Sequence, residues 1–220
     1  MHANSRQVAS AQQTPHARLE EIVRRHLSVP YRRRPSNVGR EAFLEIKERV
    51  GSRRWMLDAG CGTGESTCEI ARRFPDHLVV GIDKSAARLG KNLDSIKPAN
   101  AILVRCDCVD FWQLAAAENM RCDRQFLLYP NPWPKPDHVK RRWHAHPIFP
   151  ALLAVGGGLE LRTNWRVYAE EFGIALKVAG IDAMFSSVDG ADSLTPFERK
   201  YQASGHSIYR LDAFSSAADF

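Results

Sequence analysis

The sequence predicts an α/β protein with a mostly parallel, seven-stranded sheet and helices on both faces. Short apolar runs alternate with longer amphipathic segments from residue 54 onward, a glycine-rich turn follows the first run, and the first three runs end at or beside an aspartate. This alternation is typical of βαβ units, in which strands lie in parallel and helices cover the sheet.

The predicted strands are short, and the predicted helices lie between them. Strands are expected at residues 54–58, 78–83, 101–106, 125–129, 159–163, 183–188 and 207–211. Helices are expected at residues 65–74, 85–96, 109–119, 149–155 and 166–179. The sequence therefore predicts one doubly wound domain over residues 37–220, preceded by a basic, flexible extension over residues 1–36.

The composition excludes several classes of protein. The 220 residues are 44% hydrophobic and 25% charged, which is typical of a globular domain rather than a disordered or fibrous chain. No uncharged apolar run reaches about 18 residues, so no membrane span is expected. Five cysteines without a CxxC pair argue against a disulfide framework or a cysteine-built zinc site. We expect a cytoplasmic protein without a bound metal; the sequence leaves the oligomeric state open.

The excess of positive charge lies in the first part of the chain. The formal net charge is +6, and residues 1–50 contain ten Lys and Arg against five Asp and Glu. A basic arm on a nearly neutral body favours an anionic polymer such as nucleic acid as the partner. A solvated leader and an organelle transit segment are the alternatives for this stretch.

A glycine-rich turn follows the first predicted strand. Gly60, Gly62 and Gly64 alternate with other residues between that strand and the next helix. Glycines at such positions allow a tight turn and a close approach of the backbone to a ligand.

Three aspartates accompany this turn. Asp58, Asp83 and Asp107 lie at or just beyond the carboxyl ends of the first three strands, where open α/β sheets bind their ligands. A carboxylate after the second strand can accept the hydroxyls of a ribose. These acids would repel the pyrophosphate of NAD or FAD, so a ligand without phosphate fits better. The alternative for Asp58 and Asp107 is that they cap helices or turns.

The turn and the three acids together resemble class I S-adenosylmethionine-dependent methyltransferases. The resemblance implies a single Rossmann-like domain. It also implies S-adenosyl-L-methionine as the cofactor, which has a ribose, an adenine and a cationic amino-acid tail but no phosphate.

A proline-rich loop follows the fourth predicted strand. Its sequence is Pro130-Asn131-Pro132-Trp133-Pro134, and each proline fixes its own φ angle and lacks an N–H donor. A rigid loop at the carboxyl end of a strand is suited to hold Asn131 and Trp133 over a ligand pocket.

A basic run follows this loop. It comprises Lys135, His138, Lys140, Arg141 and Arg142, with Trp143 directly after it. Clustered Lys and Arg suit phosphate contacts, while His and Trp are able to stack on bases. The alternative is a solvated surface run without a partner.

Three signatures in order resemble the tRNA (guanine-N7)-methyltransferase family. They are the proline-rich loop with its basic run, the segment Leu161-Arg162-Thr163-Asn164-Trp165, and the segment Thr195-Pro196-Phe197-Glu198-Arg199. The match extends from about Asn37 to Leu211. It implies methyl transfer to N7 of a guanosine in the variable loop of tRNA.

The resemblance also assigns a role to individual residues. The cofactor positions are Asp58, Gly60, Gly62, Gly64, Asp83, Asp107 and Asn131, and Asn131 is also the catalytic position. The substrate positions are Lys135, Asn164, Thr195, Phe197 and Glu198. The residues expected to contact RNA are His138, Lys140, Arg141 and Arg142.

Two departures from the family pattern affect the expected chemistry. The family has an aspartate where this chain has Asn131, and another where it has Asn164. Both asparagines keep a hydrogen-bonding side chain of similar shape but lose the negative charge. Two other functions therefore remain open: an amino-group methyltransferase that uses the Asn131-Pro132-Trp133 loop, and an RNA-binding protein that binds the cofactor with weak or no catalysis.

Overall fold

The computed structural model describes residues 8–89, 97–188 and 192–214, which form two compact units. The central unit contains residues 33–128 and 151–157. The split unit contains residues 8–32 and 129–150 and the described residues from 158 onward. Each unit has its own strands and helices.

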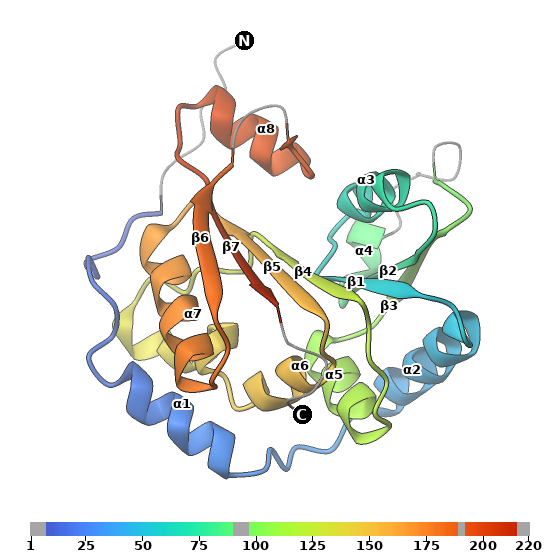
Figure 1. Cartoon of the computed structure of the whole chain (residues 1–220), viewed down its shortest axis with the longest axis horizontal. Coiled ribbons are helices and arrows are strands. Elements are labelled where there is room, and N and C mark those ends of the chain that lie inside the picture. The colour runs from blue at the N-terminus through green and yellow to red at the C-terminus, as the bar shows by residue number, and fades with distance from the viewer. Residues whose placement is uncertain (1–7, 90–96, 189–191, 215–220) are drawn as a thin grey trace. The chain divides into compact units, whose positions relative to one another are not determined.

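The central unit contains four parallel strands. They are β1 (Trp55–Ala59), β2 (Leu78–Asp83), β3 (Ala101–Arg105) and β4 (Arg124–Leu128), in the order β3-β2-β1-β4. In this unit α3 (Glu65–Arg73) and α4 (Ala86–Leu89) lie on one face, while α2 (Asn37–Val50) and α5 (Cys108–Ala117) lie on the other (Figure 1). Every residue of β1 and β2 is buried, as expected for strands covered on both faces.

Helix α2 begins at a side-chain cap and was not predicted. The Ser36 hydroxyl accepts the backbone N–H of Gly39 and donates to a carboxylate oxygen of Asp110, 2.6 Å away. Asp110 is buried on α5, so one polar contact ties the start of α2 to α5. The apolar residues Phe43 and Ile46 then bury one face of the helix.

The split unit contains three strands with antiparallel pairing. They are β5 (Gly158–Thr163), β6 (Ala183–Ser187) and β7 (Tyr209–Phe214), in the order β5-β7-β6. Its helices are α1 (Leu19–Ser28), α7 (Arg166–Val178) and α8 (Pro196–Ala203), with short 3-10 helices η1 (Pro136–Arg141) and η2 (Trp143–Ala145). Helix α7 packs on β5 and β7, and α1 packs on α7 and η2. Helix α6 (Phe149–Ala154) contributes residues to both units.

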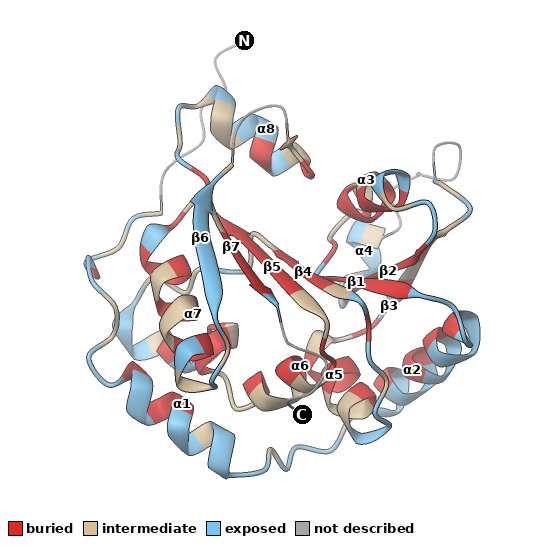
Figure 2. Cartoon of the chain, viewed as in Figure 1, coloured by how far each residue is buried: buried red, intermediate tan, exposed pale blue. Residues whose placement is uncertain are grey.

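Residues 8–32 belong to the split unit. Leu19, Ile22 and Val23 are buried on one side of α1, while its other side is exposed (Figure 2). Further upstream, the Ser10 hydroxyl donates to the carbonyl of Pro134 at 2.6 Å. Residues 8–32 therefore contain one helix that packs within the split unit, and the predicted domain boundary at residue 37 stays a prediction.

All seven predicted strands are present, with boundary shifts of a few residues. The largest shift is in β7, which was expected at residues 207–211 and continues to Phe214 because it pairs with β5 as far as Gly158. The helix predicted at residues 85–96 is described only as α4, and residues 90–96 lie outside the described residues. Helices α1, α2 and α8 were not predicted.

Two negative findings apply to the described residues alone. No helix there is both long enough and apolar enough to cross a membrane. Within the same residues, His, Cys, Asp and Glu side chains form no group of three that would hold a metal ion.

Candidate functional site

The glycine turn of the central unit has the backbone conformation that its sequence predicts. The φ angles of Gly60, Gly62 and Gly64 are +79°, +61° and +86°, values that other residues rarely adopt. The backbone N–H groups of Gly60 and Cys61 both donate to the carbonyl of Ile82, which ties the turn to the end of β2.

The three glycines do not have the same surroundings. A Cβ atom on Gly60 or Gly62 would meet no described atom within 4 Å, whereas a Cβ atom on Gly64 would lie 2.5 Å from the side chain of Leu103. The first two glycines therefore leave open space beside the backbone. Gly64 is required for packing against β3.

One carboxylate oxygen of Asp58 accepts hydrogen bonds from α3, and the other has no hydrogen-bond partner among the described residues. Its Oδ2 atom accepts hydrogen bonds from Ser66 at 2.6 Å and Thr67 at 2.7 Å, both in the first turn of α3. Its Oδ1 atom is buried and has no hydrogen-bond partner among the described residues. Burial raises the pKa of Asp58 to about 6, although the two hydroxyl donors act in the opposite direction.

Asp83 is held by the glycine turn and by its own loop. Its Oδ2 atom accepts the N–H of Gly62 at 3.0 Å, and its Oδ1 atom accepts the N–H of Ser85 at 2.8 Å. The guanidinium of Arg88 lies 2.9 Å from the same Oδ1 atom. The carboxylate is thus fixed at the end of β2, next to the turn.

Asp107 is the N-cap of α5. Its Oδ1 atom accepts the N–H of Val109 at 2.8 Å, as the capping alternative predicts. Its Oδ2 atom accepts no hydrogen bond from the described residues, and the side chain is partly exposed. The capping role of Asp107 therefore leaves one oxygen for a ligand.

These residues together fit a phosphate-free ligand that carries hydroxyls and a positive charge. The strand order β3-β2-β1 places the three aspartates on neighbouring carboxyl ends, beside the open side of the glycine turn. A buried carboxylate oxygen without a donor is suited to a cationic group or a hydroxyl. These acceptor groups fit S-adenosylmethionine, and the cofactor roles predicted for the individual residues stay predictions.

The proline-rich loop of the split unit contains two strained residues. Tyr129 and Trp133 have φ angles of +53° and +46°, a region that aromatic residues seldom occupy. The N–H of Tyr129 donates to the carbonyl of Arg162 at 2.8 Å, which fixes the start of the loop on β5. Asn131 is exposed, and its side chain makes no hydrogen bond with a described residue.

Two of the residues predicted to contact RNA lie around the ring of Trp133. The guanidinium of Arg141 lies 4.8 Å from the Trp133 ring centroid, and the His138 ring lies edge-on at 5.8 Å. Lys135 and Lys140 are exposed in the same segment. This part of the basic run therefore presents cations and an aromatic ring to solvent.

Arg142 lies elsewhere, which corrects its predicted role. Its side chain is fully buried, forms an ion pair with Glu171 of α7, and donates to the carbonyl of Trp133 at 2.9 Å. Its guanidinium also lies over the ring of Trp165 at 4.8 Å. Because the side chain of Arg142 is fully buried in this conformation, it holds the loop in place and does not lie at the surface where an RNA contact was predicted.

Glu171 is the centre of this buried network. Its Oε1 atom accepts the side-chain amide of Gln12 at 2.7 Å and the N–H of His16 at 2.9 Å, and its Oε2 atom is shared by Arg142 and His144. Burial opposes ionisation, but the hydrogen bonds and charges of His144 and Arg142 lower the pKa of Glu171 to about 2. The carboxylate links the N-terminal segment, α7 and the basic run.

Two residues of the segment at 195–199, which was predicted to bind substrate, stabilise the fold. Thr195 and Glu198 form a capping box at the start of α8, with the Thr195 hydroxyl accepting the N–H of Glu198 at 3.0 Å. Glu198 is fully buried and pairs with Arg162 at 3.1 Å. Phe197 is different, because 59% of its surface is exposed.

Asn164 lies between β5 and α7, and its side chain is half-buried. The described residues provide no hydrogen-bond partner for its amide. Its neighbour Trp165 is buried beneath Arg142, so Trp165 does not line an open base pocket in this conformation.

Comparison with known proteins decides the family. Residues 52–211 match the Methyltransf_4 family of methyltransferases. A tRNA (guanine-N(7)-)-methyltransferase of Pseudomonas savastanoi is 31% identical over 168 residues, which cover 70% of this chain and 68% of the relative. A protein of the same name from Stutzerimonas stutzeri is 30% identical over 79% of this chain and 76% of its own. This chain belongs to the tRNA (guanine-N7)-methyltransferase family.

Solved structures confirm the fold class of this methyltransferase. The 16S rRNA methyltransferase KamB aligns with a TM-score of 0.57 at 18% identity, over 86% of this chain and 99% of its own. A structure titled as an antibiotic-related methyltransferase aligns with a TM-score of 0.59 at 16% identity, over 79% and 94% of the two chains. At such identities the likeness shows the Rossmann-like methyltransferase fold alone.

Four residues of the buried networks in this methyltransferase, Gln12, Glu160, Arg162 and Glu171, were not predicted as part of its site. Arg162 and Glu160 are charged residues inside a predicted apolar strand, which is a signal of a buried ion pair, and they lie 2.6 Å apart. Gln12 and Glu171 carry no such signal, because they lie 159 residues apart in the chain.

Proposed function

We propose that this methyltransferase transfers a methyl group from S-adenosylmethionine to N7 of a guanosine in tRNA, in the variable loop. The observation that carries the proposal is the similarity to relatives named tRNA (guanine-N(7)-)-methyltransferase, which covers 70% of the chain or more. The exposed cations and aromatic ring after the fourth strand support an RNA substrate.

The three aspartates and the glycine turn would hold the cofactor. In its ionised form Asp58 would accept from the cationic amino-acid tail through Oδ1, and Asp83 would accept from the ribose hydroxyls. Gly60 and Gly62 leave room for the ligand beside the backbone. When bound, S-adenosylmethionine supplies an electrophilic methyl group on a sulfonium.

The proposed reaction needs no general base. Guanine N7 has a lone pair in the plane of the ring, so no proton has to leave before the nitrogen attacks the methyl carbon. The contribution of the protein is then mainly alignment of the nitrogen, the methyl carbon and the sulfur, which is worth several kcal/mol. Asn131 would accept a hydrogen bond through its amide oxygen, although without the strength that a charge gives.

The exposed part of the basic run would bind the RNA. Lys135 and Lys140 are suited to phosphates, which they would contact as point charges. Trp133 and Arg141 offer flat surfaces on which an unstacked base can lie. Phe197, in the predicted substrate segment at residues 195–199, offers an exposed aromatic ring.

Methyl transfer to bulk tRNA tests the proposal. The protein is incubated with radiolabelled S-adenosylmethionine and tRNA that lacks 7-methylguanosine, and the product is digested to nucleosides. Label in 7-methylguanosine is the expected result. Label in N6-methyladenosine would establish the amino-group alternative, and cofactor and tRNA binding without transfer would establish the binding-protein alternative. The Asn131→Ala variant is the negative control, since it should lose transfer.

A further inference from the structure

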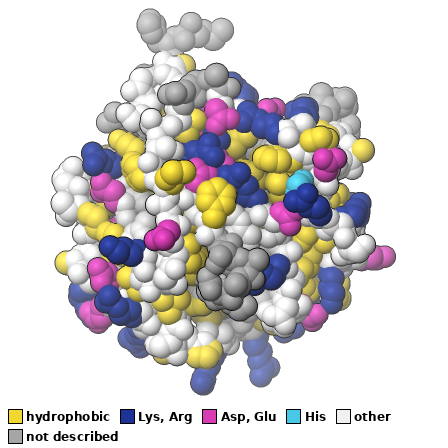
Figure 3. Space-filling model, in the orientation of Figure 1, with side chains coloured by type: hydrophobic (Ala, Val, Ile, Leu, Met, Phe, Trp, Pro, Cys, Tyr) yellow, Lys and Arg dark blue, Asp and Glu magenta, His cyan; other side chains and the backbone are white. Residues whose placement is uncertain are grey.

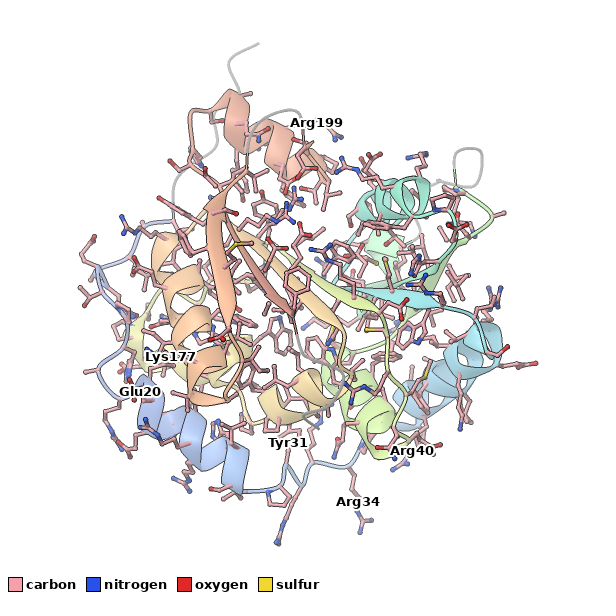
Figure 4. All side chains as sticks on the ribbon, viewed as in Figure 1. Glu20, Tyr31, Arg34, Arg40, Lys177 and Arg199 are labelled. Carbon is pink, nitrogen blue, oxygen red and sulfur yellow. The ribbon has the colours of Figure 1, made fainter. Side chains whose placement is uncertain are left out.

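Helix α1 and the residues that follow it lie beside the basic run. Helix α1 packs on η2, which is next to η1 in the chain and in space. Further along, the ring of Tyr31 lies 5.7 Å from that of His146, which lies 5.9 Å from that of Trp143. Figure 4 labels Glu20 on α1 and Tyr31 in the segment after it.

A cation of α1 and a cation of η1 both lie close enough to His26 to affect its pKa. Burial lowers the pKa of His26, and the positive charges of Lys140 and Arg25 lower it further. Arg25 from α1 and Lys140 from η1 thus approach one imidazole from two different elements. Both side chains are exposed.

The arginines of this region fall into two groups. Arg18 pairs with Glu21, and Arg24 pairs with Glu20, each at 2.7 Å on α1. Arg25 and Arg32 are exposed and have no carboxylate partner among the described residues.

The cations without a carboxylate partner leave this surface positive. They are Arg25, Arg32, Lys140 and Arg141; the exposed acids of the same segments are Asp137 and the two glutamates that pair with Arg18 and Arg24, Glu20 and Glu21. On the face drawn in Figure 3, Lys and Arg side chains are interspersed with acidic and apolar ones. With the paired Arg18 and Arg24 included, six exposed cations face three exposed acids, and this excess is suited to a partner with several regularly spaced negative charges, as in an RNA backbone.

We propose that Arg25 and Arg32 bind phosphates of the tRNA outside the methylated nucleotide, so that the RNA-binding surface extends from η1 onto α1 and the segment after it. This inference rests on the proposed function, because it takes tRNA as the partner. The packing of α1 on η2 and α7 gives the extension a fixed position, with Lys140 near His26 of α1. The contact depends on charge and carries no base specificity.

The salt dependence of tRNA binding tests this inference. In the full-length protein, the pair Arg25→Ala and Arg32→Ala removes two unpaired cations, while the control pair Arg18→Ala and Arg24→Ala removes two ion-paired cations. Both pairs lower the net charge by the same amount. We expect the first pair to weaken tRNA binding about tenfold and to reduce the slope of log K against log [salt] by roughly 1.4 to 1.8. The control pair should leave the slope unchanged.

Further measurements separate the possible failures. Unchanged S-adenosylmethionine binding would show that both pairs are folded, and Arg25→Lys with Arg32→Lys should keep the wild-type slope. Equal slopes in the two alanine pairs, or no loss in either, would overturn the inference. A wild-type protein that makes no 7-methylguanosine would instead contradict the proposed function. A raised KM for tRNA with an unchanged kcat is the kinetic result expected of the first pair.

Discussion

Arg142 lies over the buried ring of Trp165, with its guanidinium carbon 4.8 Å from the ring centroid, and forms an ion pair with Glu171. The last charged residue of the basic run is thus buried. Removing one partner of a buried ion pair leaves the other charge without compensation.

The Arg142→Ala variant should therefore lose stability. We expect the free energy of unfolding to fall by about 3 to 5 kcal/mol, because Glu171 loses its counter-charge. Urea denaturation measures this, with Arg141→Ala as the control, which should change stability by less than about 0.5 kcal/mol. A stable Arg142→Ala protein with weak tRNA binding would restore the prediction that Arg142 contacts RNA.

Substitutions of Phe197 and Glu198, which are neighbours in the chain, should have different effects on stability and on tRNA binding. Glu198→Gln removes a buried charge that pairs with Arg162 and is expected to cost about 2 to 4 kcal/mol of unfolding free energy. Phe197→Ala should leave stability nearly unchanged and raise the KM for tRNA, since the ring is exposed. Thermal unfolding and steady-state kinetics on both variants distinguish the two roles. An unchanged KM for Phe197→Ala would remove Phe197 from the substrate site.

Alanine substitutions at Gly64 and Gly60 should differ in their effect on stability and on cofactor binding. Gly64→Ala should destabilise the fold by about 2 to 4 kcal/mol, because a positive φ angle is combined with a clash against Leu103. Gly60→Ala has the same backbone strain without a clash, so it should cost about 1 to 2 kcal/mol. Calorimetry with S-adenosylmethionine should show weaker binding for Gly60→Ala, as its Cβ enters the open space. Wild-type affinity of the Gly60→Ala variant for S-adenosylmethionine would show that the cofactor does not bind beside Gly60.

Cofactor affinity should depend on pH through Asp58. Its pKa of about 6 means that the carboxylate is mostly protonated at pH 5, so affinity should fall roughly tenfold between pH 7 and pH 5. Stability has the opposite sign: because the folded state holds the proton more tightly, this group reduces stability as pH rises from about 4 to 6. Titration calorimetry and denaturation at several pH values measure both trends. The Asp58→Asn variant should flatten both, and an unchanged pH profile in that variant would assign them to another group.

Replacing Asn131 and Asn164 by aspartate tests whether the missing negative charges limit the rate of methyl transfer. Asn131→Asp combined with Asn164→Asp should raise the rate of methyl transfer, because a carboxylate offsets the positive charge that arrives on the base. The initial rate with saturating tRNA and S-adenosylmethionine is the quantity to compare. An equal or lower rate in the double variant would show that the amides are sufficient.

The central unit was predictable because its signals are local. Each of its strands is a short apolar run, and the turn at Gly60, Gly62 and Gly64 is confirmed with three positive φ angles. The position of Asp107 as a helix cap was predicted as an alternative and is also confirmed.

The split unit was less predictable because its contacts are distant in the chain. Glu171 receives donors from Gln12, His16, Arg142 and His144, and no sequence pattern links these residues. Arg142 was misplaced for the same reason: its neighbours in sequence are exposed cations, but its partner is on α7. Helix α1 was missed because its charged residues outnumber the few apolar ones that it buries.

The split unit also determines when the protein can finish folding during synthesis. The central unit is complete once the ribosome has added residue 157, whereas β7 ends only at Phe214. Gln12 and Leu19 must therefore wait for α7, and the early-made segment stays without its partners while the middle of the chain is translated. Nascent chains halted before residue 166 should accordingly leave the α1 region open to proteases.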